Sequence, residues 1–296
     1  MVTQVAGATL HRADRLTDAQ VTAVRALAER CADTDGVGPL NEDALLGLVA
    51  ADRTHLLLDD GAAGYAVIAG GAVQLMVDPL RRRAGLGAGL AETAAGTDMP
   101  PTSWWAFGDL PGARALAARR GLVVVRELLR LGRALTDLPA ARPLPDRARL
   151  RPFRPGHDDA AWLDVNARAF ADHPEQGRMT AEDLTARMAE DWFDPAGLLL
   201  AVAADDPDRV LGFHWTKITP QRPGTGEVYV LGVDPDAAGG GLGGALLDAG
   251  LSHLVGRGAD TVDLYVEGDN EPALGLYRRA GFDELARDVM YGEGPR

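Results

Sequence analysis

A motif that occurs twice at a fixed separation constrains the fold of this chain more than any other feature. Residues 77–79 read Val-Asp-Pro and residues 85–87 read Gly-Leu-Gly, and both triplets return at 233–235 and 241–243. The separation is 156 residues at all six positions. Identities held in register at one period are the mark of an internal repeat. The chain has 296 residues, enough for two ordinary domains, so it is predicted to contain two copies of one fold.

The second copy indicates what the motif builds. Residues 228–233 form an apolar run that ends at Asp234 and Pro235, five glycines fall within 239–244, and a helix-favouring segment starts at Ala245. This order predicts a strand, a turn, a glycine loop and a helix. Glycines let the backbone approach an anion closely, and a helix start offers free N–H groups with a partial positive charge. A phosphate-bearing ligand is therefore expected.

Around these loops each copy is predicted to alternate helices and strands, which gives a mixed α/β class. Strands are expected at 55–58, 64–69, 72–77, 104–107, 122–133, 198–203, 210–217, 227–233, 261–266 and 283–291. Helices are expected at 16–34, from about 41, at 111–120, 180–191 and 272–280, and after each glycine loop. Three prolines without apolar periodicity mark 136–148 as a linker. We expect an N-terminal domain at 1–136, a linker at 137–148 and a C-terminal domain at 149–296.

Composition narrows the possible partners. The net charge of −13 opposes general binding to nucleic acid, so an anionic ligand has to be held by local donors. No apolar run approaches a membrane span, and the first residues lack the pattern of a signal peptide. A single cysteine, Cys31, favours a cytoplasmic location. His173 and His214 have no further ligand at metal-site spacing, so no metal is expected.

Two common glycine loops do not match these copies. A P-loop needs Gly-Lys-Ser/Thr after its glycines, and a dinucleotide loop follows the first strand of its unit, whereas each loop here follows three β segments. The pattern V-x-P-x-x-R-x-x-G-x-G, with strands before it and a helix after it, resembles the acetyl-CoA site of the GNAT N-acetyltransferases. Residues 82–87 fit that pattern in the first half. In the second half Ala238 stands where the family usually has Arg or Gln, which implies that backbone N–H groups hold the pyrophosphate.

Further motifs extend the resemblance over nearly the whole chain. Residues 264–282, LYVEGDNEPALGLYRRAGF, look like the second GNAT signature, in which an Asn, a helix and a Tyr line the CoA arm. The segments DGVGPLNE (35–42), RRGLVVVREL (119–128), HPEQGRMT (173–180), WFDP (192–195) and GFHWTK (212–217) look like a tandem GNAT subfamily of actinomycetes. That subfamily acetylates the cysteinyl amine of a cysteinyl-glucosaminyl-inositol. The resemblance implies small-molecule substrates, acetyl-CoA as the donor and a monomer that already contains two copies.

The resemblance also implies the cofactor contacts. In the second half they are Leu231, Gly232, Val233, Ala238, Gly239, Gly240, Gly241, Leu242, Gly243, Gly244, Asn270, Glu271, Pro272, Ala273, Leu274 and Gly275. In the first half they are Leu75, Met76, Val77, Arg82, Arg83, Ala84, Gly85, Leu86 and Gly87.

Amide formation needs a base for the incoming ammonium and an acid for the departing thiolate. In the second half Glu227 enters the strand before the loop and Tyr277 lies four residues before Gly281. The matching positions of the first half are Gly71 and Ala117, which cannot move a proton. We therefore predict that the second half is catalytic, with Glu227 as base, acting through water or with a raised pKa, and Tyr277 as acid.

The acceptor is expected to lie among carboxylates and hydrogen-bonding groups. By the resemblance these are Glu42 of the first half and Glu175, Lys217, Glu227 and Tyr265 of the second. Two alternatives stay open: a GNAT enzyme that acetylates another amine, such as an aminoglycoside or a protein N-terminus, and a non-catalytic acyl-CoA sensor.

Overall fold

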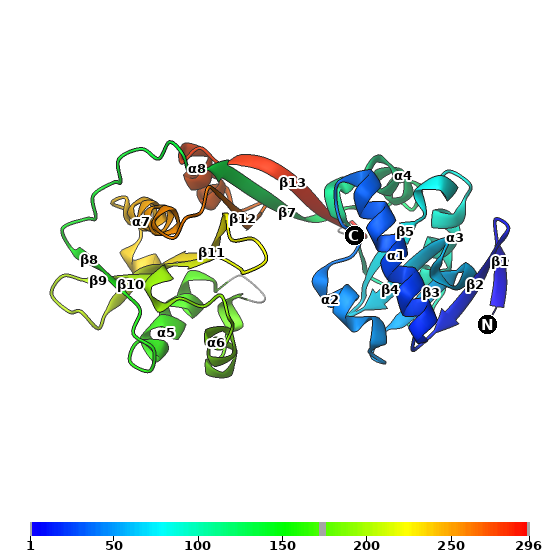
Figure 1. Cartoon of the computed structure of the whole chain (residues 1–296), viewed down its shortest axis with the longest axis horizontal. Coiled ribbons are helices and arrows are strands. Elements are labelled where there is room, and N and C mark those ends of the chain that lie inside the picture. The colour runs from blue at the N-terminus through cyan, green and yellow to red at the C-terminus, as the bar shows by residue number, and fades with distance from the viewer. Residues whose placement is uncertain (1, 172–175, 295–296) are drawn as a thin grey trace. The chain divides into compact units, whose positions relative to one another are not determined.

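The computed structural model describes residues 2–171 and 176–294. The chain forms two compact units (Figure 1). The first unit comprises Met1–Leu129, Glu267–Asp269 and Ala286–Arg296, and the second comprises Arg130–Val266 and Asn270–Leu285. The units do not follow the order of the chain, because the last strand starts in the second unit and ends in the first. Within the described residues, none of the helices has the length and apolar character needed to cross a membrane.

The first unit is a mixed sheet with helices on both faces. Its helices are α1 (Asp18–Asp35), α2 (Glu42–Leu46), α3 (Leu86–Ala95) and α4 (Pro111–Arg119). Its strands are β1 (Val2–Val5), β2 (Ala8–Ala13), β3 (Thr54–Leu58), β4 (Gly64–Ala69), β5 (Ala72–Val77), β6 (Ser103–Ala106), the first part of β7 (Val123–Ala134) and most of β13 (Asp283–Gly292). The strand order is β1-β2-β3-β4-β5-β6-β13. These helices and most of these strands match the sequence-based predictions, whereas the hairpin of β1 and β2 has no counterpart among them.

Alternating side chains of β3 build two separate cores in the first unit. Leu56 and Leu58 pack with α3 and α4, whereas Leu57 packs with α1 and α2. Successive residues of a strand point to opposite faces, so an unbroken apolar run is what a sheet covered on both sides requires. The apolar runs seen in the sequence are therefore explained by two helical layers.

The second unit repeats this plan. Its helices are α5 (Asp159–Ala169), α6 (Ala181–Met188), α7 (Leu242–Gly256) and α8 (Glu271–Arg279). Its strands are β8 (Ala148–Pro152), β9 (Leu198–Ala203), β10 (Val210–Lys217), β11 (Thr225–Val233), β12 (Thr261–Glu267), the end of β7 and the start of β13. The strand order is β7-β12-β11-β10-β9-β8. Leu200 and Trp215 pack with α5 and α6, and Ala201 packs with α7.

An irregularity in β11 determines on which face of the sheet the side chains of its first half lie. Trp215 of β10 pairs with Val230, but the next residue of β10 pairs with Val228, so Tyr229 is an extra residue. A β-bulge of this kind shifts the alternation of side chains by one position. As a result Glu227 lies on the same face of the sheet as Trp215, the face covered by α5 and α6.

The corresponding hairpin of the first unit has no such shift. Strands β4 and β5 pair continuously from Gly64 with Val77 to Ala69 with Ala72, across the two-residue turn at Gly70 and Gly71. The bulge therefore distinguishes the second copy from the first.

Candidate active site

The glycine loop of the second unit ends in an open helix start. Gly239, Gly240 and Gly241 have φ angles of +89°, +62° and +81°, a region that residues with a Cβ rarely adopt. Gly241 is the N-cap of α7 and, because it has no side chain, it makes no side-chain cap hydrogen bond to the first N–H groups of this helix. Such groups are the donors that bind a phosphate. The loop therefore has the geometry that the sequence predicted for an anion site.

Arg147 contacts this loop and was not among the residues predicted from the sequence. Its Nη2 atom donates to the carbonyl of Ala237 at 3.0 Å and to that of Gly239 at 3.2 Å. One guanidinium thus binds two carbonyl groups of the loop. No motif or spacing marks an arginine this far before the loop. Ala238 itself is exposed and offers no side-chain donor.

The first copy of the loop differs in its chemistry. Gly85 caps α3 with a φ of +90°, but Arg83, at the position of Gly239, is held at +65°. Arg82 is bound in a bidentate ion pair to Asp35, with both N–O distances 2.7 Å. Hydrogen bonding to Asp35 raises the pKa of the Arg82 guanidinium further. The arginine that the resemblance assigns to pyrophosphate thus has a partner within its own unit.

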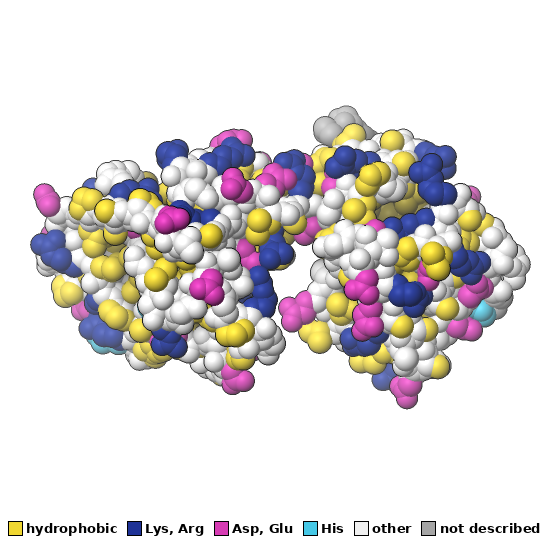
Figure 2. Space-filling model, turned by 45° about the horizontal axis from the view of Figure 1, so that its top comes forward, with side chains coloured by type: hydrophobic (Ala, Val, Ile, Leu, Met, Phe, Trp, Pro, Cys, Tyr) yellow, Lys and Arg dark blue, Asp and Glu magenta, His cyan; other side chains and the backbone are white. Residues whose placement is uncertain are grey.

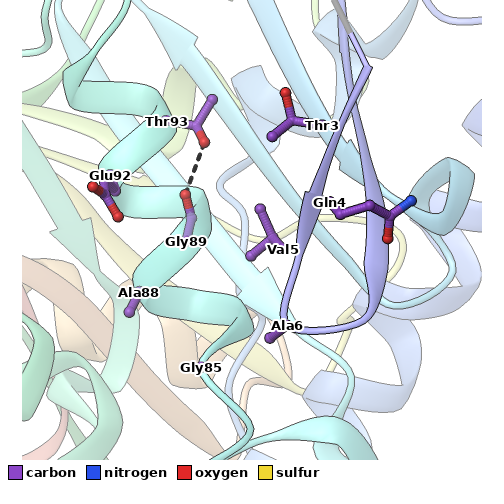
Figure 3. A pocket seen from close by; sticks show the side chains of 9 residues that line it. All are labelled: Thr3, Gln4, Val5, Ala6, Gly85, Ala88, Gly89, Glu92 and Thr93. Carbon is purple, nitrogen blue, oxygen red and sulfur yellow. Dashed lines mark hydrogen bonds between the residues drawn. The ribbon is translucent and has the colours of Figure 1, made fainter.

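The N-terminal hairpin also lies against this first loop. In Figure 3 Val5 and Ala6 stand beside α3, with a cavity of about 480 Å³ between the hairpin and the helix. A Cβ at Gly85 would lie 3.7 Å from that of Ala6, and a Cβ at Gly89 would overlap Val5. The glycines at the N-cap and in the first turn of α3 therefore let the hairpin pack closely beside the loop. Of the strand residues assigned to the cofactor here, Met76 and Val77 are buried and Leu75 is half-buried.

Glu227 lies beside the only lysine of the chain. The Nζ atom of Lys217 is 3.9 Å from Glu227 Oε2, and the two residues are paired across β10 and β11. The Lys217 ammonium also stands 4.8 Å from the ring centre of Trp192 and 4.9 Å from that of Tyr229, a cation–π arrangement. Burial raises the pKa of the Glu227 carboxyl, and Lys217 partly opposes this shift. A partly buried carboxylate with a raised pKa is suited to accept a proton near neutral pH.

Tyr277 is the other residue expected to move a proton. It lies in α8 with its side chain buried, and its ring centre is 5.6 Å from that of Phe282. Burial raises the pKa of its hydroxyl, which at its ordinary pKa of about 10 already keeps its proton at neutral pH. At the matching positions of the first unit, Ala117 is buried in α4 and Gly71 forms the β4–β5 turn.

The start of α8 carries the remaining cofactor prediction. Asn270 caps the helix by accepting a hydrogen bond from the Ala273 N–H at 3.1 Å, and Pro272 occupies the first turn. Leu274 is buried, so its side chain serves the core. This segment is therefore ordered by its own caps and packing.

Three predicted acceptor residues, Lys217, Glu227 and Tyr265, share one face of the sheet in the second unit. Tyr265 is 54% exposed in β12, two positions after Asp263, which pairs with Glu227. Glu42 is exposed at the start of α2 in the first unit. Glu175 and most of the HPEQ segment fall outside the described residues.

Asp263 is a further charged residue of this face that the sequence analysis missed. It is 3% exposed and accepts from Arg130 at 2.7 Å and from Arg222 at 2.9 Å. Residues 2–171 and 176–294 contain no group of three or more His, Cys, Asp or Glu side chains that could hold a metal ion.

Comparison with known proteins places this geometry in a family. A model described as the acetyltransferase (GNAT) family matches residues 162–282. A protein of Thermomonospora curvata named mycothiol acetyltransferase is 50% identical over 291 residues, covering 95% of this chain and 96% of its own. A GCN5-related N-acetyltransferase structure from Sphaerobacter thermophilus has a TM-score of 0.72 and 25% identity, covering 97% of this chain and 96% of that one.

A tandem GNAT protein from the clavulanic acid biosynthesis pathway shares the fold, with a TM-score of 0.66 and 20% identity over 97% of this chain and 99% of that one. The expected mixed α/β class with two GNAT folds is confirmed. Fold and loop geometry define the class as a tandem GNAT acetyltransferase. Within that class, the chain belongs to the mycothiol acetyltransferase family.

Proposed function

We propose that the second unit transfers the acetyl group of acetyl-CoA to the cysteinyl amine of a cysteinyl-glucosaminyl-inositol, which gives mycothiol and CoA. The observation that carries this proposal is the bulge at Tyr229. It turns Glu227 to the face that also bears Lys217 and Tyr265, while the strand continues into the glycine loop. A base and a cofactor loop are thereby joined by one strand.

In this proposal the cofactor is held mainly by backbone groups. The pyrophosphate binds the N–H groups at Gly239–Gly244 and the start of α7, where the helix end is open. The thioester carbonyl accepts a hydrogen bond from a backbone N–H of 231–233, which stabilises the oxyanion of the tetrahedral intermediate. The face shown in Figure 2 carries acidic and basic side chains close together.

The proposed proton transfers use the carboxylate of Glu227 and the hydroxyl of Tyr277. Glu227, ionised, removes a proton from the ammonium of the acceptor, directly or through water. The free amine attacks the thioester carbon, the new C–N bond forms, and the C–S bond breaks. The hydroxyl of Tyr277, which carries its proton at neutral pH, donates to the departing sulfur. The products are the amide and the CoA thiol.

The first unit is proposed to be a copy without catalytic groups. Its hairpin lacks the bulge, and Gly71 and Ala117 replace the base and the acid. It retains Gly85 and Gly87 of the loop, which supports a binding or structural role rather than turnover.

Release of the CoA thiol tests the proposal. The full chain, acetyl-CoA and the cysteinyl-glucosaminyl-inositol are mixed, and free thiol is followed after correction for the thiol of the acceptor. We expect turnover that saturates with the acceptor. Equal or faster turnover with an aminoglycoside or a peptide N-terminus, or no turnover with any amine, would contradict the assignment.

A further inference from the structure

Arg147 lies directly before β8, and its own backbone holds it there. Its carbonyl accepts a hydrogen bond from the N–H of Ala204, the residue that follows β9, at 2.8 Å. Its side chain reaches the glycine loop, where Nη2 donates to the carbonyls of Ala237 and Gly239. The guanidinium therefore connects the loop to strands β8 and β9 of the same unit.

These hydrogen bonds set the direction of a backbone N–H group in the loop. The peptide between Gly239 and Gly240 is trans, and in a planar trans peptide the N–H points away from the C=O. Since the Gly239 carbonyl points to Arg147, the N–H of Gly240 points to the opposite side of the loop. Within residues 2–171 and 176–294, the N–H groups of Gly240 and Gly241 donate no hydrogen bond, and both residues are exposed. An anion on that side can accept hydrogen bonds from them.

Gly240 also makes room for the arginine. A Cβ at Gly240 would lie 3.0 Å from the Nη1 atom of Arg147, so a larger residue would press against the guanidinium. At Gly239 and at Gly241 an added Cβ would meet no atom within 4 Å. The close approach of Arg147 thus occurs at the middle glycine, the residue whose N–H it directs.

The charge of Arg147 is available to an anion. Across the part of the chain that the structure describes, no carboxylate lies within ion-pair distance of Arg147. Arg142, which lies beside the first turn of α7, is bound instead to Asp248 at 2.6 Å. The loop of the first copy has its own arginine, Arg82, and the second copy has Ala238 at the matching position, 156 residues further on. Arg147 thus brings to the second loop, from another segment, a cation that the loop itself lacks.

We infer that Arg147 is a positioning residue for the pyrophosphate of the cofactor. It acts through the peptide between Gly239 and Gly240, whose N–H it directs to the anion, and its charge favours an anion at the same loop. The backbone N–H groups remain the contacts, and a side chain from outside the loop fixes their direction. The inference rests on the cofactor site of the proposed function.

Calorimetric titration of the full chain with CoA and with 3′-dephospho-CoA tests this role. Both ligands carry the pyrophosphate, and only CoA carries the 3′-phosphate. Arg147→Met keeps a long unbranched side chain but has no N–H donors. We expect one site per chain to bind either ligand about tenfold more weakly in this variant, the loss expected for one hydrogen bond to a charged group.

Two further variants separate this role from a purely structural one. Arg147→Lys keeps the charge and can still donate to the loop carbonyls, so it should retain most of the affinity. Arg149→Gln is the matched control, because it alters an exposed arginine two residues further on that donates to the carbonyls of Asp146 and Ala148. It should leave both dissociation constants unchanged. Thermal denaturation checks that each variant is folded.

Four results would overturn the inference. They are wild-type protein that binds no CoA, Arg147→Met that binds CoA as tightly as the wild type, a loss that is as large in Arg147→Lys as in Arg147→Met, and a loss confined to CoA. The last result would assign Arg147 to the 3′-phosphate. Failure of the proposed function appears separately, as wild-type protein that binds CoA but releases no CoA thiol from acetyl-CoA and the acceptor.

Discussion

The ammonium of Lys217 lies 3.9 Å from the carboxylate of Glu227, and the two residues face each other across β10 and β11. Three other charged residues act on the same carboxylate: Asp263 of β12 raises its pKa, while Arg222 before β11 and Arg130 of β7 lower it. Burial is the largest influence and raises the pKa. The pKa of the proposed base is therefore set by burial and by a small set of charges, and each charge can be removed by a single substitution.

The first prediction concerns the pH profile. A base works in its ionised form, so kcat/KM should fall as the pH drops through the pKa of Glu227. Lys217→Met removes a charge that lowers this pKa, so the acidic limb of kcat/KM should move to higher pH. Lys217→Arg keeps the charge and should keep the limb near its wild-type position. An acidic limb that stays in place or moves to lower pH in Lys217→Met would argue against Glu227 as the titrating group.

Tyr277→Phe tests the proposed acid. The phenyl ring should keep its contact with Phe282, so the fold should be preserved while the hydroxyl is lost. We expect kcat to fall about 100-fold, at the low end of the range for general acid catalysis, with little change in the KM for acetyl-CoA. Phe282→Leu is the control for packing. A wild-type kcat in Tyr277→Phe would remove this hydroxyl from the mechanism.

The two glycine loops offer a matched pair of substitutions. Gly85 and Gly241 cap α3 and α7 with φ angles of +90° and +81°, and neither has a neighbour closer than 3.7 Å to an added Cβ. Alanine at either position should cost about 1–2 kcal/mol of backbone strain. Gly241→Ala should raise the KM for acetyl-CoA several-fold, whereas Gly85→Ala should leave turnover nearly unchanged. Equal losses of activity in both variants would contradict a catalytic role confined to the second unit.

A buried ion-pair cluster should stabilise the second unit. Asp158 is 2% exposed and accepts hydrogen bonds from Arg151 at 2.6 Å and from Arg154 at 2.9 Å. Burial opposes its ionisation, but hydrogen bonds from Arg151, Arg154 and His157 hold the pKa of the Asp158 carboxyl well below its usual range. Asp158→Asn should lower the free energy of unfolding by about 1–3 kcal/mol, the range for weakened hydrogen bonds to a charged group, because the arginine side chains, 18% and 46% exposed, can be hydrated after the loss of their counter-charge.

The sign of the pH dependence follows from that lowered pKa. The contribution of Asp158 to stability is present above the ordinary carboxyl pKa of about 3.9 and is lost as the pH falls below it. Urea denaturation of wild type and Asp158→Asn at pH 7 and at pH 3 should therefore show a difference that shrinks in acid. A difference that is absent at pH 7, or that grows in acid, would contradict this role.

The order of helices and strands in the two units could be predicted because local sequence patterns determine it. Apolar runs, glycines at fixed spacing and the Pro272 helix start are each determined within a few residues, and the structure has strands and helices at those places. Three features escaped because they depend on distant partners. The bulge at Tyr229 does not interrupt the apolar run of β11 in the sequence. Strand β13 pairs with β6, although the two are far apart in the chain. Arg82 forms its ion pair with Asp35 of α1, far from it in sequence.

Some residues of the candidate site could also be predicted from the sequence, and others could not. Roles for Glu227 and Tyr277 could be predicted from their positions relative to the glycine loop and Gly281, and a role for Lys217 from the resemblance of its segment; these roles stay predictions. Asp263 and Arg147 could not be predicted in this way. A buried acid within a strand and an arginine directly before a strand have no distinctive sequence spacing. Their roles follow from contacts: two arginines on one carboxylate, and one guanidinium on two loop carbonyls.

The most direct test of the central claim is the rate of CoA-thiol release by Glu227→Gln with acetyl-CoA and the cysteinyl-glucosaminyl-inositol. The substitution keeps the size of the side chain and removes its ability to accept a proton from an ammonium. The account predicts a kcat at least about 100-fold below wild type, an unchanged affinity for acetyl-CoA, and full activity in Glu190→Gln, which alters an exposed glutamate elsewhere in the second unit. A Glu227→Gln variant that turns over at the wild-type rate would contradict it.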